Sequence, residues 1–462
     1  MNRKAFRNLS RHLFSWRPWL SEFRCSMLVC HLFSSHPYLA YTSSSNVKYT
    51  LIEEVEYLGY YQQGGYHPTQ INDRLHNRYR IVHKLGHGTF STVWLAVDEQ
   101  TYKYVAVKVG ISDTDIIREA DILSQLGKRA NAVSSRFDNR ASMIRLPLDC
   151  FDLDGPNGTH PCIVTVLGRC SLQDAKRAPG PGLFQLDVAR SLAAQLTMAV
   201  SLVHSQGYAH GDLHLGNVLL HLPSSIANLS VDQLYANFGA PKPERILRED
   251  RKPIFPTSGV PSHAIPPVWL GIASHKIPLA EAKSSLTDFG TAFRPSDKSR
   301  FESYTPMIIQ PPEAFFEPET SLSFASDIWS LGCTIFELFS DGPLMDSQDE
   351  IIAEQVHLQG PLPAEWWAGW KERSQWFDGA GRPLGDDCDI WPWDRRFDGW
   401  IQEPRQSCGM DVIKEGEKTE LLALLRWMLT WKPEGRPSAE EVLDSAWMKK
   451  WALPAYEQSG KG

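Results

Sequence analysis

Three segments in the first third of the chain have a period of two, with residues such as Val93, Leu95 and Val97, or Val105, Val107 and Val109, at every second position. They run from Tyr79 to His83, from Val93 to Val97 and from Tyr104 to Val109. Successive side chains of a β-strand point to opposite faces, so each segment is predicted to be a strand. In the third, Ala106 and Lys108 share one face. A small residue beside a cation suits a strand that lines an adenine and phosphate pocket, although a half-buried strand with a solvated lysine gives the same pattern.

Two later segments have helical spacing. Ile116, Leu123 and Leu126 fall on one stripe that also contains Glu119. A carboxylate in an apolar stripe is costly unless it is paired, and Lys108 is its natural partner. The alternative is a glutamate at the edge of the stripe that reaches water. A second helix begins at Asp327–Cys333 and is apolar nearly all round, which predicts a fully buried helix.

A glycine-rich run joins the first two predicted strands. It extends from Leu85 to Val93 and contains Gly86 and Gly88, where the missing Cβ lets the backbone approach phosphate oxygens. Ser91 takes the place of a third glycine, and we expect it to stiffen the far end of the loop. An ordinary hairpin turn would have the same composition.

The run from His210 to Asn217 carries the strongest chemical signal. Asp212 can accept the proton of an attacking hydroxyl, and the amide oxygen of Asn217 can hold a metal ion that bridges nucleotide phosphates. Further on, Asp288 follows a short apolar segment and precedes Phe289-Gly290, which suits a second metal ligand. Both motifs in this order indicate a kinase-type catalytic centre.

These residues resemble a eukaryotic-type protein kinase from about Tyr79 to about Trp451. Gln310–Glu313 stands where that family has Ala-Pro-Glu, and Gly435–Ala439 matches its late arginine motif. The resemblance implies an α+β, two-lobed protein kinase fold, with a small, mainly antiparallel β N-lobe that has one key helix and a larger, mainly α-helical C-lobe. It also implies that Arg436 pairs with Glu313.

The closer resemblance is to the SR-protein kinases, in a fungal-looking variant. Four pieces carry it: Gly64–Pro68 before Asn77–Ile81, Phe90–Ala96 with its Ser91, Asp154–His160 before a hinge at about 164–168, and Asp327–Ser330. It implies an ATP- and Mg²⁺-dependent serine/threonine kinase that phosphorylates serines in basic Arg/Ser-rich proteins such as splicing factors. It implies no direct binding of nucleic acid.

The resemblance also assigns roles to individual residues. Lys108, held by Glu119, would orient the α- and β-phosphates, Asp212 would be the base, and Asn217 and Asp288 would hold Mg²⁺. His214 stands where most protein kinases have a lysine that touches the γ-phosphate. The nucleotide-binding set comprises Leu85, Gly86, Gly88, Ser91, Val93, Ala106, Lys108 and Asp288.

Three departures from the family change the expectations. Gly211 replaces the arginine that docks a phosphorylated activation segment, so we expect an enzyme that is active as synthesised. His214 is at best partly charged at pH 7, which weakens electrostatic help there. Asn217 and Asp288 are 288 − 217 = 71 residues apart, and we interpret the proline-rich surplus as a surface insertion.

These landmarks predict the organisation of the chain. We expect a basic, disordered leader at 1–50, an extension at 51–78, a kinase domain at 79–453 (N-lobe about 79–167, C-lobe about 168–453, insertion about 221–285) and a tail at 454–462. The tryptophans from Trp366 to Trp400 are interpreted as an insertion that packs on the C-lobe, with a partner-binding surface as the alternative.

Residues 1–50 and the remainder of the chain carry net charges of opposite sign. The net charge is −7, while residues 1–50 carry seven Lys or Arg and one acid, so the remainder carries −7 − 6 = −13. An acidic body suits a basic substrate. The leader has the composition of a mitochondrial transit peptide, but we favour a disordered extension or a start codon placed too far upstream.

The cysteines and the apolar runs indicate the cellular compartment in which the protein resides. The eight cysteines lack metal-ligand spacing, which indicates a reducing compartment, and no apolar run reaches the ~18 residues of a membrane span. We therefore expect a monomer in the cytoplasm and nucleus, without contact with a membrane.

Two other functions share part of the pattern. Small-molecule phosphotransferases resembling aminoglycoside and choline kinases also use a His-Gly-Asp run, but Glu313, Arg436 and the Asp327 helix belong to the peptide-binding lobe of protein kinases. An inactive kinase-fold scaffold is the other alternative, favoured only by Gly211 and His214.

Overall fold

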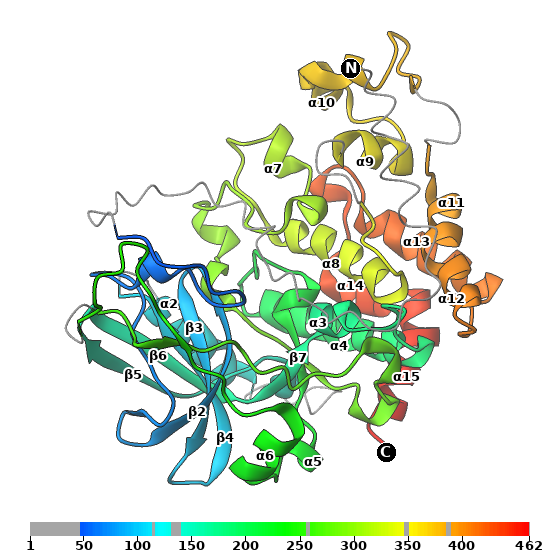
Figure 1. Ribbon diagram of the computed structural model, residues 1–462. Coiled ribbons are helices and arrows are strands. Elements are labelled where there is room, and N and C mark those ends of the chain that lie inside the picture. The colour runs from blue at the N-terminus through cyan, green and yellow to red at the C-terminus, as the bar shows by residue number, and fades with distance from the viewer. Residues whose placement is uncertain are drawn as a thin grey trace. The chain divides into compact units, whose positions relative to one another are not determined.

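A computed structural model describes residues 47–112, 116–130, 140–255, 259–345, 351–384 and 390–461. The leader expected at 1–50 lies outside these residues, apart from its last four. The described chain contains an antiparallel sheet followed by a mainly helical part, as Figure 1 shows. The predicted two-lobed kinase fold is confirmed.

The N-lobe is a six-stranded antiparallel sheet in the order β1-β2-β3-β4-β6-β5. All three predicted strands are present, since they fall within β2, β3 and β4. One face buries Trp94 with the valines of β4, and the other buries Val82 and Leu95. The strands are β1 (Arg74–Leu75), β2 (Tyr79–Gly88), β3 (Ser91–Asp98), β4 (Lys103–Gly110), β5 (Pro147–Gly155) and β6 (Gly158–Val166).

The C-lobe is built around two apolar helices, α4 (Leu186–Ser205) and α8 (Phe324–Phe339). Nearly every residue of α8 is buried, as its sequence predicts. Within the described residues, α4 alone is long and apolar enough to cross a membrane, but 89% of its apolar window is buried inside the lobe, as in the core helix of a soluble protein. Outside the insertion, the other described α-helices of the lobe are α3 (Leu172–Arg177), α7 (Glu313–Phe316), α9 (Ile351–Gln359), α10 (Ala364–Gly369), α11 (Trp393–Phe397), α12 (Glu403–Ser407), α13 (Glu415–Met428), α14 (Ala439–Asp444) and α15 (Leu453–Ser459).

A small sheet positions two of the predicted site residues, Asn217 and Asp288. Its antiparallel strands, in the order β11-β8-β7, are β7 (Gly168–Ser171), β8 (Val218–His221) and β11 (Ser284–Leu286). Because β8 directly follows Asn217 and β11 ends just before Asp288, the pairing of these strands brings together two segments that are 71 residues apart in the chain.

The insertion is not a surface excursion, so that interpretation is wrong. Leu234 and Leu270 are buried against Val82 and Leu95 on the second face of the N-lobe sheet. The Tyr235 hydroxyl donates a hydrogen bond to the carbonyl of Val82 (2.7 Å). The insertion contributes α5 (Ser224–Ala227), α6 (Val231–Phe238), β9 (Glu244–Arg245) and β10 (His263–Ala264), and α6 lies beside β2 and β4 in Figure 1.

The C-terminal residues also differ from expectation. Residues 453–459 form α15, whose Ala455 and Ser459 are buried, and the Ser191 hydroxyl of α4 donates to Ser459 Oγ (3.4 Å). This segment is therefore part of the C-lobe and not a separate tail.

The tryptophan-rich segment packs on the C-lobe, as expected. The Trp366 ring is stacked on Phe316 of α7 with 5.1 Å between centroids, and Trp370 and Phe377 are buried beside it.

Candidate active site

Lys108 and Glu119 form the predicted ion pair. Lys108 Nζ lies 2.8 Å from Glu119 Oε2 and 3.0 Å from Asp288 Oδ1, and Glu119 is buried in α2 (Ile116–Ala130). Burial alone would lower the pKa of Lys108, but the carboxylates of Asp288 and Glu119 outweigh it and raise the pKa. The ammonium group is therefore fixed as a cation, which is the state that can bind phosphate.

The same glutamate also fixes the segment that follows Asp288. The Phe289 N–H donates to Glu119 Oε1 (3.2 Å), and the Phe289 ring is fully buried against the His210 ring, with 4.9 Å between centroids. Asp288 itself has a left-handed backbone (φ 62°, ψ 72°). The charge of Lys108 holds the pKa of Asp288 below its usual value, so this carboxylate is ionised at neutral pH.

One carboxylate oxygen of Asp212 accepts a hydrogen bond from a described residue, and the other accepts none. Its Oδ2 accepts a hydrogen bond from Asn217 Nδ2 (3.1 Å), and the same nitrogen donates to the Asp212 carbonyl (2.9 Å). Its Oδ1 is buried and accepts no hydrogen bond from any described residue. A buried carboxylate oxygen without a donor is costly, and an incoming hydroxyl group would satisfy it.

Asn217 and Asp288 offer oxygen ligands. The amide nitrogen of Asn217 is occupied by Asp212, which leaves its amide oxygen for a cation. The Asn217 carbonyl accepts from the Thr287 N–H (2.9 Å), directly before Asp288. No group of three or more His, Cys, Asp or Glu side chains that could hold a metal ion by itself is present in the described residues. One amide and one carboxylate suit Mg²⁺, which binds few protein ligands and takes the rest from phosphates and water.

His214 faces Asp212. Its Nδ1 accepts a hydrogen bond from the Gly216 N–H (3.0 Å), so the neutral ring carries its proton on Nε2, 3.6 Å from Asp212 Oδ1. The ring therefore presents an N–H group at the position where most protein kinases have lysine.

The Gly-rich loop has the expected open positions. A Cβ atom added at Gly86 or Gly88 would meet no described atom within 4 Å. Val93 lies opposite Lys108 across β3 and β4, and Ala106 lies opposite Leu95. Leu85 and Ala106 are partly buried beside the second face of the sheet, and Ser91 is buried. Apart from Asp288, the predicted nucleotide residues thus come from the adjoining strands β2, β3 and β4.

Asp327 anchors the catalytic loop, a role that the sequence analysis missed. Its carboxylate accepts from the backbone N–H groups of His210 (2.7 Å) and Gly211 (2.9 Å) and contacts His204 Nε2 (2.9 Å). Burial would raise the pKa of Asp327, but these donors outweigh it and lower the pKa. The available signal was an acid in the first turn of a helix that is apolar nearly all round.

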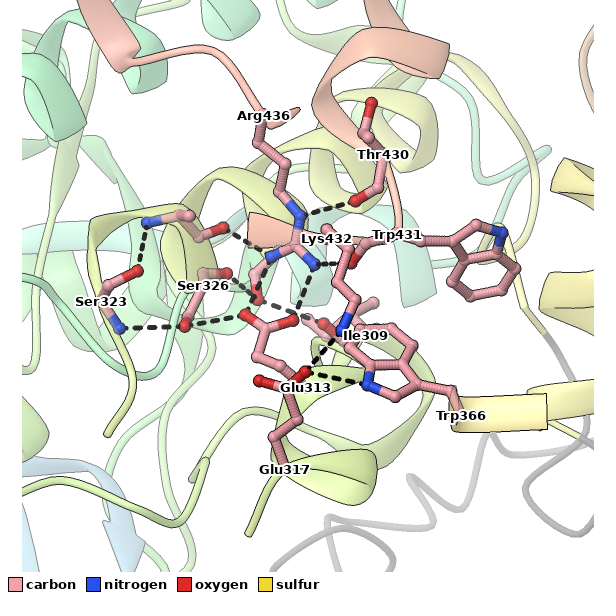
Figure 2. Close-up of polar contacts among 12 residues, drawn as sticks. Ile309, Glu313, Glu317, Ser323, Ser326, Trp366, Thr430, Trp431, Lys432 and Arg436 are labelled. Carbon is pink, nitrogen blue, oxygen red and sulfur yellow. Dashed lines mark hydrogen bonds and ion pairs between the residues drawn. The ribbon is translucent and has the colours of Figure 1, made fainter. Parts of the chain in front are cut away.

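Glu313 and Arg436 form a buried bidentate pair, at distances of 2.7 and 2.9 Å (Figure 2). The remaining guanidinium donors bind the carbonyls of Thr430, Trp431 and Ala325, so every N–H of Arg436 has an acceptor. In Figure 2 the pair joins the first residue of α7 to the segment after α13. The pairing implied by the resemblance is confirmed.

Comparison with known proteins agrees with this geometry. The sequence profile described as protein kinase domain matches residues 277–448. A serine/threonine protein kinase of Aspergillus fumigatus is 27% identical over 86% of this chain and 90% of its own length. The serine/threonine-protein kinase SRPK of Physarum polycephalum is 26% identical over 84% and 90% of the two chains. Human SRSF protein kinase 3 is 33% identical over 40% of this chain and 33% of its own.

The fold, the Lys108–Glu119 pair, the segment from His210 to Asn217 and these similarities lead to one assignment. The chain is a serine/threonine protein kinase that resembles the SR-protein kinases.

Proposed function

We propose that the protein transfers the γ-phosphoryl group of ATP to serine hydroxyls in basic, Arg/Ser-rich proteins such as splicing factors. The observation that carries the proposal is the buried Oδ1 of Asp212, which lacks a donor among the described residues beside His214 and Asn217. A serine hydroxyl is the kind of group that fits there, because it donates one hydrogen bond and then gives up that proton.

Each predicted site residue has its own role in this phosphoryl transfer. Gly86, Gly88 and Val93 cover the nucleotide, and Lys108 binds the α- and β-phosphates. Asn217 and Asp288 would hold Mg²⁺, which neutralises phosphate charge when it is bound. As the serine oxygen forms its bond to the γ-phosphorus, the bond from that phosphorus to ADP breaks and the serine proton passes to Asp212.

The choice of an Arg/Ser-rich substrate has two supports. The charge of −13 outside residues 1–50 favours a basic partner. Similar proteins include the SRSF protein kinase 3 of human and the kinase SRPK of Physarum polycephalum.

A substrate comparison tests the proposal. The purified protein is incubated with labelled ATP, Mg²⁺ and one of three acceptors: an Arg-Ser peptide, the same peptide with glutamine for arginine, or small amino-alcohols. We expect label in the Arg-Ser peptide and at least ~100-fold less with Asp212→Asn, the size of a lost general base. Labelled amino-alcohols would support a small-molecule phosphotransferase instead, and no label in any acceptor would support a scaffold.

A further inference from the structure

Tyr66, in the Gly64–Pro68 motif ahead of the kinase domain, contacts the Gly-rich loop. Its hydroxyl lies 2.8 Å from the carbonyl oxygen of Gly88 and 3.1 Å from that of Thr89, and its proton is shared between them. The Tyr66 side chain is buried, with 3% of the residue exposed, whereas Gly88 and Thr89 are exposed. Burial raises the pKa of Tyr66, so the hydroxyl keeps the proton that it donates.

The backbone around Tyr66 is fixed on both sides. The Tyr66 N–H donates to the Tyr60 carbonyl (3.0 Å), and the Tyr66 carbonyl accepts from Asn157 Nδ2 (2.7 Å). A Cβ atom at Gly65 would lie 1.8 Å from the Tyr60 carbonyl oxygen, so only glycine fits at this position. This explains why the tyrosine follows a glycine, and it gives the hydroxyl a defined place.

The insertion supports the same tyrosine. The Tyr66 ring lies in a buried cluster with Val55, Leu58 and Tyr61 of the extension and with Ile246, Val260 and Ala264 of the insertion. Asn157 Nδ2 also donates to the Gly259 carbonyl (2.8 Å), so one side chain ties the extension to the insertion. Two segments that are distant in sequence therefore form one support.

A buried ion pair attaches the extension to the strand that leads into the loop. Lys84 of β2 is fully buried and paired with Glu56, whose other oxygen accepts from the Tyr61 hydroxyl. Breaking such a pair leaves an uncompensated buried charge, which is strongly destabilising. The extension is thus held close to β2, and Tyr66 reaches the end of the same strand.

Gly86 and Gly88 have no side chains, and an added Cβ atom at either position would contact no described atom within 4 Å. Side-chain packing at these two positions therefore does not hold the loop in place. A loop of this kind samples many conformations and must lose that freedom when ATP binds. We propose that Tyr66 is a positioning residue, which holds the Gly-rich loop in the conformation that covers ATP and so reduces the entropic cost of nucleotide binding. The inference rests on the nucleotide role of the loop in the proposed function.

The test removes the hydroxyl and keeps the ring. In Tyr66→Phe the two loop carbonyls lose a donor but remain accessible to water, so the protein should fold. Loss of one hydrogen bond of ordinary strength corresponds to a change of roughly threefold to tenfold in a binding constant. We expect KM for ATP to rise by about that factor while kcat changes less than about twofold, since the loop acts on binding. Hydrogen exchange of the amides from Gly86 to Ser91 should also be faster in the nucleotide-free protein.

Tyr60→Phe is the matched control. It deletes a tyrosine hydroxyl at the edge of the same cluster, and that hydroxyl makes no hydrogen bond to the loop in the described residues. Unchanged loop exchange in Tyr66→Phe, or an equal change in Tyr60→Phe, would overturn the inference. Hydrogen exchange is measured on the nucleotide-free protein, so its result does not depend on catalytic activity. If the wild type fails to phosphorylate Arg-Ser peptides while the loop exchanges faster only in Tyr66→Phe, the proposed substrate is wrong and the support of the loop stands.

Discussion

Gly211 stands where most protein kinases have arginine, and its backbone conformation explains why it is a glycine. Its φ of 78° lies in the left-handed region, and an added Cβ would lie 3.0 Å from the Thr291 carbonyl oxygen and 3.3 Å from the Phe293 ring. The Gly211 N–H also donates to Asp327 (2.9 Å). The missing arginine is thus tied to the way in which the catalytic loop meets the segment after Asp288.

Gly211→Ala should disturb both stability and activity. The left-handed conformation alone costs a residue with a Cβ about 1–2 kcal/mol. Gly207→Ala is the control, because Gly207 has a φ of 83° but open space around it. We expect both variants to lose stability in chemical denaturation and only Gly211→Ala to lose kcat, through displacement of Thr291. Equal kcat in the two variants would show that the close contact is unimportant.

Arg436→Ala should destabilise the C-lobe strongly. Removing it leaves the buried carboxylate of Glu313 without its partner, which typically costs ~3–5 kcal/mol. Arg382→Ala breaks an Arg–Asp pair in which the Arg382 side chain is 79% exposed, and should cost less than about 1 kcal/mol. Denaturant titration of the two variants measures both values. Similar small losses would mean that the Glu313 carboxylate becomes hydrated.

At the scale of elements, the segment from Thr291 to Gln310 is held in place without phosphate. Arg300 donates to the Thr291 carbonyl (3.0 Å) and lies over the Tyr304 ring (4.5 Å to the centroid). Arg294 donates to the Tyr208 hydroxyl (2.7 Å) and to Gln125 of α2 (3.0 Å). Nη2 of each arginine already binds protein acceptors, so the segment has order that phosphorylation supplies elsewhere.

The enzyme should therefore be active without phosphorylation of this segment. The candidate sites are Ser296, Ser299, Ser303 and Thr305, and Thr305 is buried. Phosphatase treatment, with mass spectrometry to confirm that the four sites are bare, should leave the initial rate unchanged. A fall greater than about tenfold, or ~1.4 kcal/mol, would reveal a docking site for phosphate.

The insertion should contribute to the stability of the N-lobe. Leu270→Ala removes a fully buried side chain from the second face of the sheet and should cost about 2–5 kcal/mol. Leu247→Ala is the same substitution in the same insertion at a residue that is 51% exposed, and should cost less than about 0.5 kcal/mol. Thermal unfolding compares them. Equal decreases in Tm for Leu270→Ala and Leu247→Ala would show that the insertion does not stabilise the N-lobe sheet.

At the scale of the whole molecule, the sequence predicts local patterns well and long-range burial poorly. The strands, the Lys108–Glu119 pair and α8 were predictable, because each follows from periodicity or from a motif within a few residues. The buried role of the insertion was not, since its few apolar residues lie among prolines and acquire meaning only against the second face of a distant sheet. The contact of Tyr66 with the loop depends likewise on a fold that no local pattern encodes.

Stability of the whole molecule should fall on mild acidification. Burial lowers the pKa of His67, His83 and His221 to about 4, against about 6.5 in an unfolded chain. Between these values the unfolded state binds more protons, so stability is complete above pH ~6.5 and decreases as the pH falls toward ~4. Tm measured from pH 7 to pH 4.5 should show this slope, and His83→Gln should reduce it. An unchanged slope in that variant would assign the effect to other groups.

The apolar face that the insertion covers also affects the chain during its synthesis. Leu270 follows Leu167, the last N-lobe residue of that cluster, by 270 − 167 = 103 residues. At ~5–20 residues per second, the ribosome needs about 5–20 s to add them. A sheet that folds as it emerges would, throughout that interval, lack the Val268 and Leu270 side chains that cover Val82 and Leu95 in the complete fold. The second face of the N-lobe sheet is therefore complete only after the whole insertion has been synthesised.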